Sequence, residues 1–253
     1  MPLRVLILGG TTEASAIARA LAGDARFDAV LSFAGRTAEP AAQPVPVRTG
    51  GFGGAQGLAA YLRAERIGAL IDATHPFAAQ MKANAAQAAA LNGVPRLAVL
   101  RPEWRPAPGD GWREVGSIAE AAAALGPAPR RVFLAIGRQE LAAFGPPHVY
   151  LIRSVDPPDP AALPPGAQVI LARGPFHEAD EAALLRAHRI EVVVAKNAGG
   201  AATEAKLAAA RSLGLSVVMV RRPPPPAPPV VPDADATLAW LAAHAGATAE
   251  RGA

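Results

Sequence analysis

The sequence has 253 residues, of which 51% are hydrophobic and 18% are charged. This apolar content excludes an intrinsically disordered chain, and the length predicts one large domain or two small ones. The net charge is +4, without a run of basic residues interleaved with aromatics, which disfavours a nucleic-acid-binding module. The chain lacks cysteine and its five histidines lack metal-ligand spacing, so we expect no disulfide and no metal site.

The first apolar run, Val5 to Leu8, is too short for a signal peptide or a membrane span. No other segment reaches the roughly 18 uninterrupted apolar residues that a spanning helix needs. We therefore expect a cytoplasmic protein, and we expect it to be a monomer.

In the first half of the chain, short apolar runs alternate with longer alanine-rich segments. The predicted strands are 5–8, 29–33, 45–48, 69–72 and 97–100, and the predicted helices are 12–22, 55–66 and 76–91. Residues 101–111 contain three prolines and two glycines and predict a linker or domain edge.

The same alternation then restarts. The predicted strands are 132–136, 149–152, 169–171, 192–195 and 217–220, and the predicted helices are 138–144, 178–188 and 203–213. Residues 223–229 contain six prolines and predict an extended surface connector before a last helix at 233–243, capped by Asp233 or Asp235.

Alternation of this kind predicts an α/β fold of two Rossmann-like domains. Each would have a roughly five-stranded parallel sheet flanked by helices. We place the N-terminal domain at residues 1–104 and the C-terminal domain at 105–253. Such sheets bind ligands at the carboxyl ends of their strands.

The first predicted strand ends in a glycine turn that leads into a helix. The amides of this helix N-terminus suit a phosphate group, although an ordinary turn with a threonine cap fits the spacing equally well. The candidate residues for cofactor contact here are Gly9, Gly10, Thr11, Thr12 and Glu13.

The end of the second strand contains Ser32 and is followed by Gly35 and Arg36. In dinucleotide-binding folds an acidic residue at this place favours NAD, and an arginine accommodates the 2′-phosphate of NADP. Arg36 therefore favours NADP, with a solvated surface arginine as the alternative. The loop that begins with Gly50 and Gly51 has four glycines in residues 50–54, so it is either a cofactor contact or a flexible surface loop.

The fourth strand is followed directly by Thr74 and His75, with Pro76 expected in the first helical turn. This arrangement aims His75 at the ligand-binding edge of the sheet. The side chain either contacts the cofactor or caps the helix.

The second half places a cation after each of four strands, at Arg138, Arg153, Arg173 and Lys196. Together they predict a site for a ligand with several carboxylates or phosphates. Asn197 and Gly200 follow Lys196 in a second glycine-rich turn, with Thr203 as the expected helix cap.

Several strings together resemble the precorrin-6A reductase family. They are Leu8 to Ala14, Asp72 to Ala78, Gly174 to Phe176, Lys196 to Gly200 with Lys206, and Val220 to Pro223. The resemblance spans residues 3 to about 223. It implies NADPH-dependent reduction of a ring double bond of precorrin-6A, giving precorrin-6B in cobalamin (corrin) biosynthesis.

The resemblance further implies a tetrapyrrole substrate whose acetate and propionate groups would explain the cations of the second half. The proton donor stays unassigned, with His75 and Lys196 as candidates beside solvent. The alternatives are an NADP-dependent reductase of another polyanionic substrate, such as cobalt-precorrin-6A, and a non-catalytic NADP-binding protein.

Overall fold

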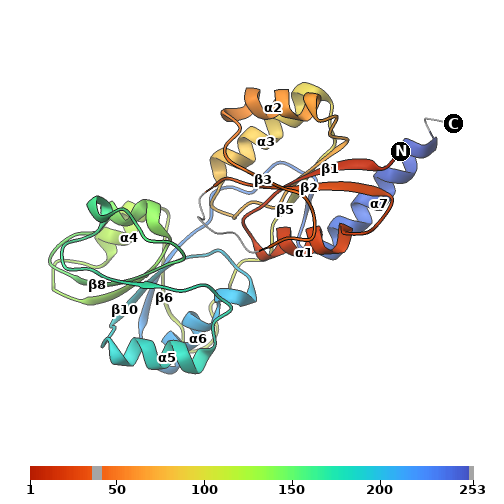
Figure 1. The fold of residues 1–253 in the computed structure, drawn as a ribbon. Helices are drawn as coiled ribbons and strands as arrows, with labels where there is room; N and C mark the ends of the chain where they lie inside the picture. The colour runs from red at the N-terminus through yellow and green to blue at the C-terminus, as the bar shows by residue number, and fades with distance from the viewer. Residues whose placement is uncertain (36–41, 251–253) are drawn as a thin grey trace. The chain divides into compact units, whose positions relative to one another are not determined.

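The computed structural model describes residues 1–35 and 42–250, which form two compact units (Figure 1). The first unit contains residues 1–101 together with the chain from residue 223 onward, and the second contains residues 102–222. The chain therefore passes from one unit to the other twice, once after Arg101 and once after Arg222.

The first unit is built on a parallel sheet of six strands within the described residues, in the order β12-β5-β4-β1-β2-β3. The strands are β1 (Leu3–Leu8), β2 (Phe27–Phe33), β3 (Val47–Thr49), β4 (Ala69–Asp72), β5 (Arg96–Val99) and β12 (Val230–Val231).

Helices cover both faces of this sheet. Helices α1 (Thr12–Leu21) and α7 (Ala234–Glu250) lie on one face, and α2 (Gly54–Ala64) and α3 (Ala79–Asn92) lie on the other (Figure 1). Successive strand side chains point to opposite faces, so Ile7 packs in the core beneath α1 while Leu6 packs in the core beneath α2 and α3. Burial on both faces explains why residues 5–8 of β1 form an uninterrupted apolar run.

The second unit repeats this plan with the strand order β6-β11-β10-β7-β8-β9, again all parallel. The strands are β6 (Gly111–Val115), β7 (Arg131–Ala135), β8 (Val149–Ser154), β9 (Gln168–Leu171), β10 (Val192–Lys196) and β11 (Ser216–Val220). Helices α5 (Glu178–Ala187) and α6 (Ala205–Ser212) cover one face, and α4 (Ile118–Ala124) lies over the other (Figure 1). Three short 3₁₀ turns complete the described part of the unit, η1 (Arg138–Ala143), η2 (Pro160–Ala162) and η3 (Ala201–Thr203).

The two-domain α/β prediction is confirmed, but the structure places the chain's end differently from the expected 105–253 domain. The C-terminal segment returns to the first unit, where Val230 and Val231 pair with β5 and the amide of Leu100 donates to the Val231 carbonyl at 2.8 Å. The proline run leads into an edge strand, the position in a sheet where a missing N–H is tolerated. Helix α7 begins where expected, because Asp233 Oδ1 accepts from the Ala236 amide at 2.9 Å.

Each sheet has six strands, one more than the roughly five expected, because β12 joins the first sheet and β6, which begins at Gly111, joins the second. Three other local expectations were wrong. Helix α3 begins at Ala79, so Pro76 lies in the preceding turn. The expected helix at 138–144 is a 3₁₀ turn. Thr203 ends η3 and does not cap α6, whose cap position is Glu204.

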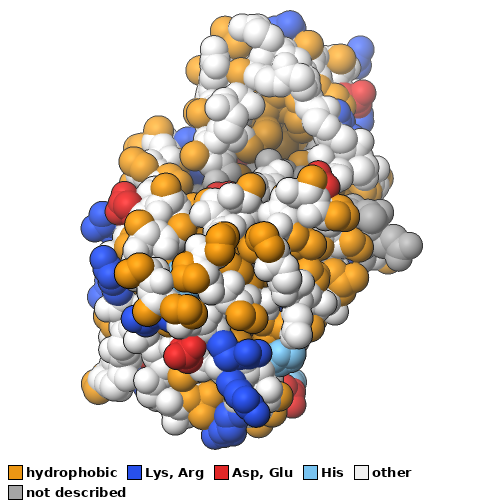
Figure 2. Space-filling model, turned by 90° about the vertical axis from the view of Figure 1, so that its left-hand side faces the viewer, with side chains coloured by type: hydrophobic (Ala, Val, Ile, Leu, Met, Phe, Trp, Pro, Cys, Tyr) orange, Lys and Arg blue, Asp and Glu red, His pale blue; other side chains and the backbone are white. Residues whose placement is uncertain are grey.

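The face drawn in Figure 2 carries many apolar side chains, with Lys and Arg gathered in places between them. Scattered apolar atoms are normal on a protein surface. Among the described residues, none of the helices combines the length and apolar content that a bilayer crossing requires.

Candidate active site

The register of the first sheet brings the predicted cofactor residues to one edge. Leu8, at the end of β1, pairs with Ser32 on one side and with Asp72 on the other. The hydrogen bonds continue past the strand ends, since Gly9 N donates to Ser32 O at 2.9 Å and Ala73 N donates to Leu8 O at 3.0 Å. The three strand ends are therefore held side by side.

The glycine turn after β1 has the backbone that close approach of a ligand requires. Gly10 has φ of 115°, and an added Cβ there would meet no atom within 4 Å, so the turn faces open space. The Thr11 side chain is committed to the fold, because its hydroxyl donates to Ala73 O at 2.8 Å and accepts from Ala14 N at 3.2 Å. The turn thus offers backbone amides and Thr12, and Thr11 fixes the helix start.

Glu13 lies in the first turn of α1, where its charge would oppose an incoming phosphate. Its carboxylate accepts from Arg101 Nη1 at 2.7 Å, and both side chains are largely buried. The ion pair neutralises Glu13 and links α1 to the segment after β5. This contact favours a structural role for Glu13, and direct cofactor contact stays a prediction.

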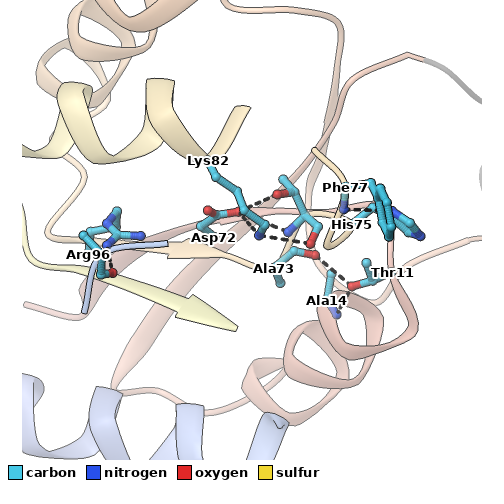
Figure 3. A network of polar contacts seen from close by, with 10 residues as sticks. Thr11, Ala14, Asp72, Ala73, His75, Phe77, Lys82 and Arg96 are labelled. Atoms are coloured by element: carbon cyan, nitrogen blue, oxygen red, sulfur yellow. Dashed lines mark hydrogen bonds and ion pairs between the residues drawn. The ribbon is translucent and has the colours of Figure 1, made fainter. Parts of the chain in front are cut away.

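A buried polar network supports the turn that carries Thr74 and His75 (Figure 3). Asp72 Oδ1 accepts from the Thr74 hydroxyl at 2.6 Å and lies 3.5 Å from Lys82 Nζ, which also donates to Thr74 O at 3.3 Å. Asp72 is fully buried, and its Oδ2 atom has no hydrogen-bond partner among the described residues. The network fixes the backbone at the end of β4.

His75 sits outside α3, so the expected capping position was wrong. Its Nδ1 atom accepts from the Phe77 amide at 3.3 Å, which places the hydrogen of the neutral ring on Nε2. Figure 3 shows the ring of His75 beside that of Phe77, and their centroids are 5.9 Å apart. The turn is therefore ordered by its own side chain.

The ends of β2 and β3 form the other part of this edge. Ser32 is buried, and its hydroxyl lies 3.4 Å from Arg48 Nη1. Gly50 N donates to Phe33 O at 2.9 Å, so this amide is used by the sheet. Gly35 has φ of 72° and lies against Gly50. Arg36, the predicted 2′-phosphate ligand, lies outside the described residues.

In the second unit, the carboxyl edge carries the predicted cations, and their surroundings differ. Lys196, at the end of β10, forms an ion pair with Glu140 of η1. Arg138 Nη1 donates to Pro157 O at 3.2 Å, and Arg173 is exposed. Arg138 follows β7, Arg173 follows β9 and Lys196 ends β10, so all three lie at the strand ends that the sequence predicts.

Arg153 is buried rather than open to a ligand. Its Nη1 and Nη2 atoms both pair with the Glu181 carboxylate, the second at 2.9 Å, and its guanidinium stacks 3.7 Å from the centroid of Phe176. The Arg153 and Glu181 side chains are 8% and 3% exposed. The geometry gives Arg153 a structural role, joining β8 to α5, and a substrate contact stays a prediction.

The turn after β10 holds the segment that enters the second unit. Asn197 Oδ1 accepts from Trp104 N at 2.9 Å and its Nδ2 donates to Trp104 O at 3.0 Å, while Gly200 O accepts from the indole Nε1 at 3.1 Å. An added Cβ on Gly199 would lie 2.0 Å from Pro102 O, so only glycine fits. Asn197 and Gly200 were predicted to bind substrate, and here their polar groups bind the chain itself.

Thr203 also contacts the chain itself and was likewise predicted to bind substrate. Its carbonyl accepts from Lys206 Nζ, which lies 4.4 Å from the centroid of the Trp104 ring. Both residues thus help to fix Trp104 against the second unit.

Comparisons with known proteins agree with this architecture. The model of the family described as Precorrin-6x reductase CbiJ/CobK matches residues 4–242. The chain belongs to this family. A precorrin-6A reductase from a Sinorhizobium species is 57% identical over 245 residues, covering 94% of each chain. One from Rhodobacter capsulatus is 53% identical over 247 residues, covering 97% of this chain and 98% of the relative.

A solved structure titled CobK precorrin-6A reductase superimposes with a TM-score of 0.91 at 53% identity. It covers 96% of this chain and 97% of that one. The similarity to this reductase family therefore extends over both units and not over the first unit alone.

Sequence reasoning missed three charged residues near these sites, Arg48, Lys82 and Arg101. Lys82 is the informative case, because it is one of only three lysines and lies on the buried face of α3. A lysine among alanines on an apolar helix face is a signal for a buried acidic partner.

Proposed function

We propose that the chain reduces precorrin-6A to precorrin-6B with NADPH as the hydride donor. The observation that carries the proposal is the match to precorrin-6A reductases at 53–57% identity over nearly the full length of both chains. Such coverage includes both units, so it supports the substrate as well as the cofactor.

The residues of the first unit fit a dinucleotide. The open glycine turn at Gly10 and the N-terminus of α1 would offer backbone amides and a positive dipole end to a pyrophosphate. The Arg101 pair removes the opposing charge of Glu13. Ser32, Gly35, Arg36, Gly50 and Gly51 would meet the adenosine end, where Arg36 would favour the 2′-phosphate.

The residues of the second unit fit an anionic substrate. Arg138, Arg173 and Lys196 follow three different strands of one sheet, and parallel strands end at a common edge. Their cationic groups would bind the carboxylates of a tetrapyrrole. Arg153 supports them through Glu181 and the stacked Phe176.

When bound, NADPH supplies a hydride to one carbon of the ring double bond, and a proton completes the neighbouring carbon. The protein's part is to orient the two reactants. Thr11 and the Asp72 network hold the glycine turn and the His75 turn together through Ala73. His75 remains one candidate proton donor, a role that its ring would fill in the imidazolium form.

The test is oxidation of reduced nicotinamide by the purified protein with precorrin-6A, with NADH and cobalt-precorrin-6A in parallel assays. We expect turnover with NADPH and precorrin-6A. Turnover with cobalt-precorrin-6A but not with precorrin-6A would overturn the assignment of the substrate. NADPH binding without turnover of either substrate would support the non-catalytic binding protein instead.

A further inference from the structure

The guanidinium of Arg48 bridges two backbone carbonyls of the glycine-rich loop, residues 50–54. Arg48 is the middle residue of β3, and its side chain donates through Nη1 to Gly50 O and through Nη2 to Gly51 O at 2.8 Å. Its Nη1 atom also lies 3.4 Å from Ser32 Oγ. A planar, forked donor is suited to holding two neighbouring carbonyls in one geometry.

Aromatic rings hold the guanidinium in turn. Its central carbon lies 3.8 Å from the centroid of Phe52 and 5.2 Å from that of Tyr61, and the two rings meet edge to face at 5.2 Å. Phe52 belongs to the loop and Tyr61 to α2. The stack therefore ties the loop to a helix of the core.

These contacts change the meaning of the four glycines in residues 50–54. Their composition alone allows a mobile surface loop, but Arg48 fixes the carbonyls at one end of the loop and Phe52 fixes its middle. The loop is thereby pre-organised at the sheet edge beside Ser32, where the adenosine half of a dinucleotide lies in such folds. Pre-organisation lowers the ordering cost of binding.

We propose that Arg48 is a positioning residue for the cofactor, which it serves by fixing the Gly50–Gly51 backbone and not by contacting the 2′-phosphate. The proposal rests on the proposed use of a nicotinamide dinucleotide. Both Nη atoms already donate to the chain's own carbonyls and one face is covered by Phe52, so the geometry favours the loop as Arg48's partner.

The two roles predict different results with the two nicotinamide cofactors. NADPH and NADH share the adenosine, and only NADPH has the 2′-phosphate. A positioning residue therefore affects the affinity for both cofactors by a similar factor, whereas a phosphate ligand affects NADPH alone.

The experiment compares the full-length chain with Arg48→Met, measuring dissociation constants for NADPH and NADH by fluorescence, and KM and kcat with precorrin-6A. We expect Arg48→Met to raise the dissociation constants for both cofactors about tenfold and to leave kcat within about twofold of the wild-type value. Arg48→Lys should not restore binding, because lysine lacks the planar fork. Unchanged affinities, or a loss confined to NADPH, would overturn the proposal.

Hydrogen exchange of the cofactor-free protein gives a readout independent of activity. We expect faster amide exchange in residues 50–57 of Arg48→Met, and unchanged exchange there would count against the proposal. If Arg48→Met does not fold, Phe52→Leu takes its place, because it removes the stacked ring and keeps Arg48. We expect Phe52→Leu to lower the affinity for both NADPH and NADH. The control is Arg19→Met, an exposed arginine in the last turn of α1, which should leave all values unchanged.

The outcome also separates this inference from the proposed function. A wild-type chain that binds neither NADPH nor NADH would refute the function itself. If the wild-type chain binds NADPH and Arg48→Met binds each cofactor as tightly as the wild type does, only the role of Arg48 is refuted.

Discussion

Replacing Lys82 with methionine removes one partner of a buried ion pair while keeping the length and apolar stem of the side chain. Lys82 is 6% exposed and Asp72 is 0% exposed. Their charged atoms are 3.5 Å apart. At an effective dielectric constant of about 20, that separation corresponds to about 5 kcal/mol of Coulomb attraction.

The measured loss in the free energy of unfolding should be somewhat smaller than this Coulomb energy, because burying the two charges also costs desolvation energy. Removing one member of a buried pair costs about 3–5 kcal/mol, since it leaves the other charge uncompensated. We therefore expect Lys82→Met to lower the free energy of unfolding by about 4 kcal/mol. The loss of the Lys82 bond to Thr74 O acts in the same direction.

The assay is urea unfolding at neutral pH followed by circular dichroism, for Lys82→Met, Asp72→Asn and the double variant. The double variant should be more stable than the sum of the single losses predicts, by about 2 kcal/mol, because both charges are gone. Gln80→Met, an exposed position of the same helix, is the control and should change stability by no more than about 0.5 kcal/mol. A loss below about 1 kcal/mol for Lys82→Met, with additive single effects, would refute the reasoning.

Three further outcomes are expected. Glu181→Gln should lower the free energy of unfolding, measured in urea, by about 3 kcal/mol, because it leaves buried Arg153 unpaired. Unchanged stability together with weaker substrate binding would instead favour a substrate-binding role for Arg153. Gly199→Ala should destabilise by at least about 2 kcal/mol, since its Cβ would overlap the connector carbonyl at 2.0 Å and its φ is 64°; a normal thermal unfolding temperature would contradict this. Burial raises the pKa of Tyr61 and Tyr150, so the folded state keeps them neutral longer; stability should be full below pH of about 10 and fall above it, and phenolate absorbance that appears below pH 10 would argue against it.

Much of the fold follows from local patterns in the sequence. Runs such as Val5 to Leu8 and Ala69 to Asp72 are short, apolar and bounded by turn residues, and both lie in strands of the structure. The order of apolar runs and helices predicts a parallel α/β protein because a parallel strand is buried on both faces. The edge that carries the candidate site residues follows too, since turns after parallel strands share one side of the sheet.

The sequence did not reveal which side chains bind the chain itself. Asn197 reads as a ligand-binding residue after a strand, but its amide is used by Trp104, 93 positions earlier in the chain. Arg153 reads as a free cation, and its charge is matched by Glu181 on a following helix. A pattern in the sequence gives a residue's place on an element but not its partner on another element.

The sequence by itself thus determined the alternation of strands and helices, the strand ends that form the candidate site and the family resemblance, because these depend on local periodicity and on contiguous motifs. The tertiary structure decided that the C-terminal segment completes the first sheet, and that Arg48, Lys82 and Arg101 support its ligand edge. The physical reason is that pairing between distant residues depends on the register and packing of whole elements, which no single segment encodes.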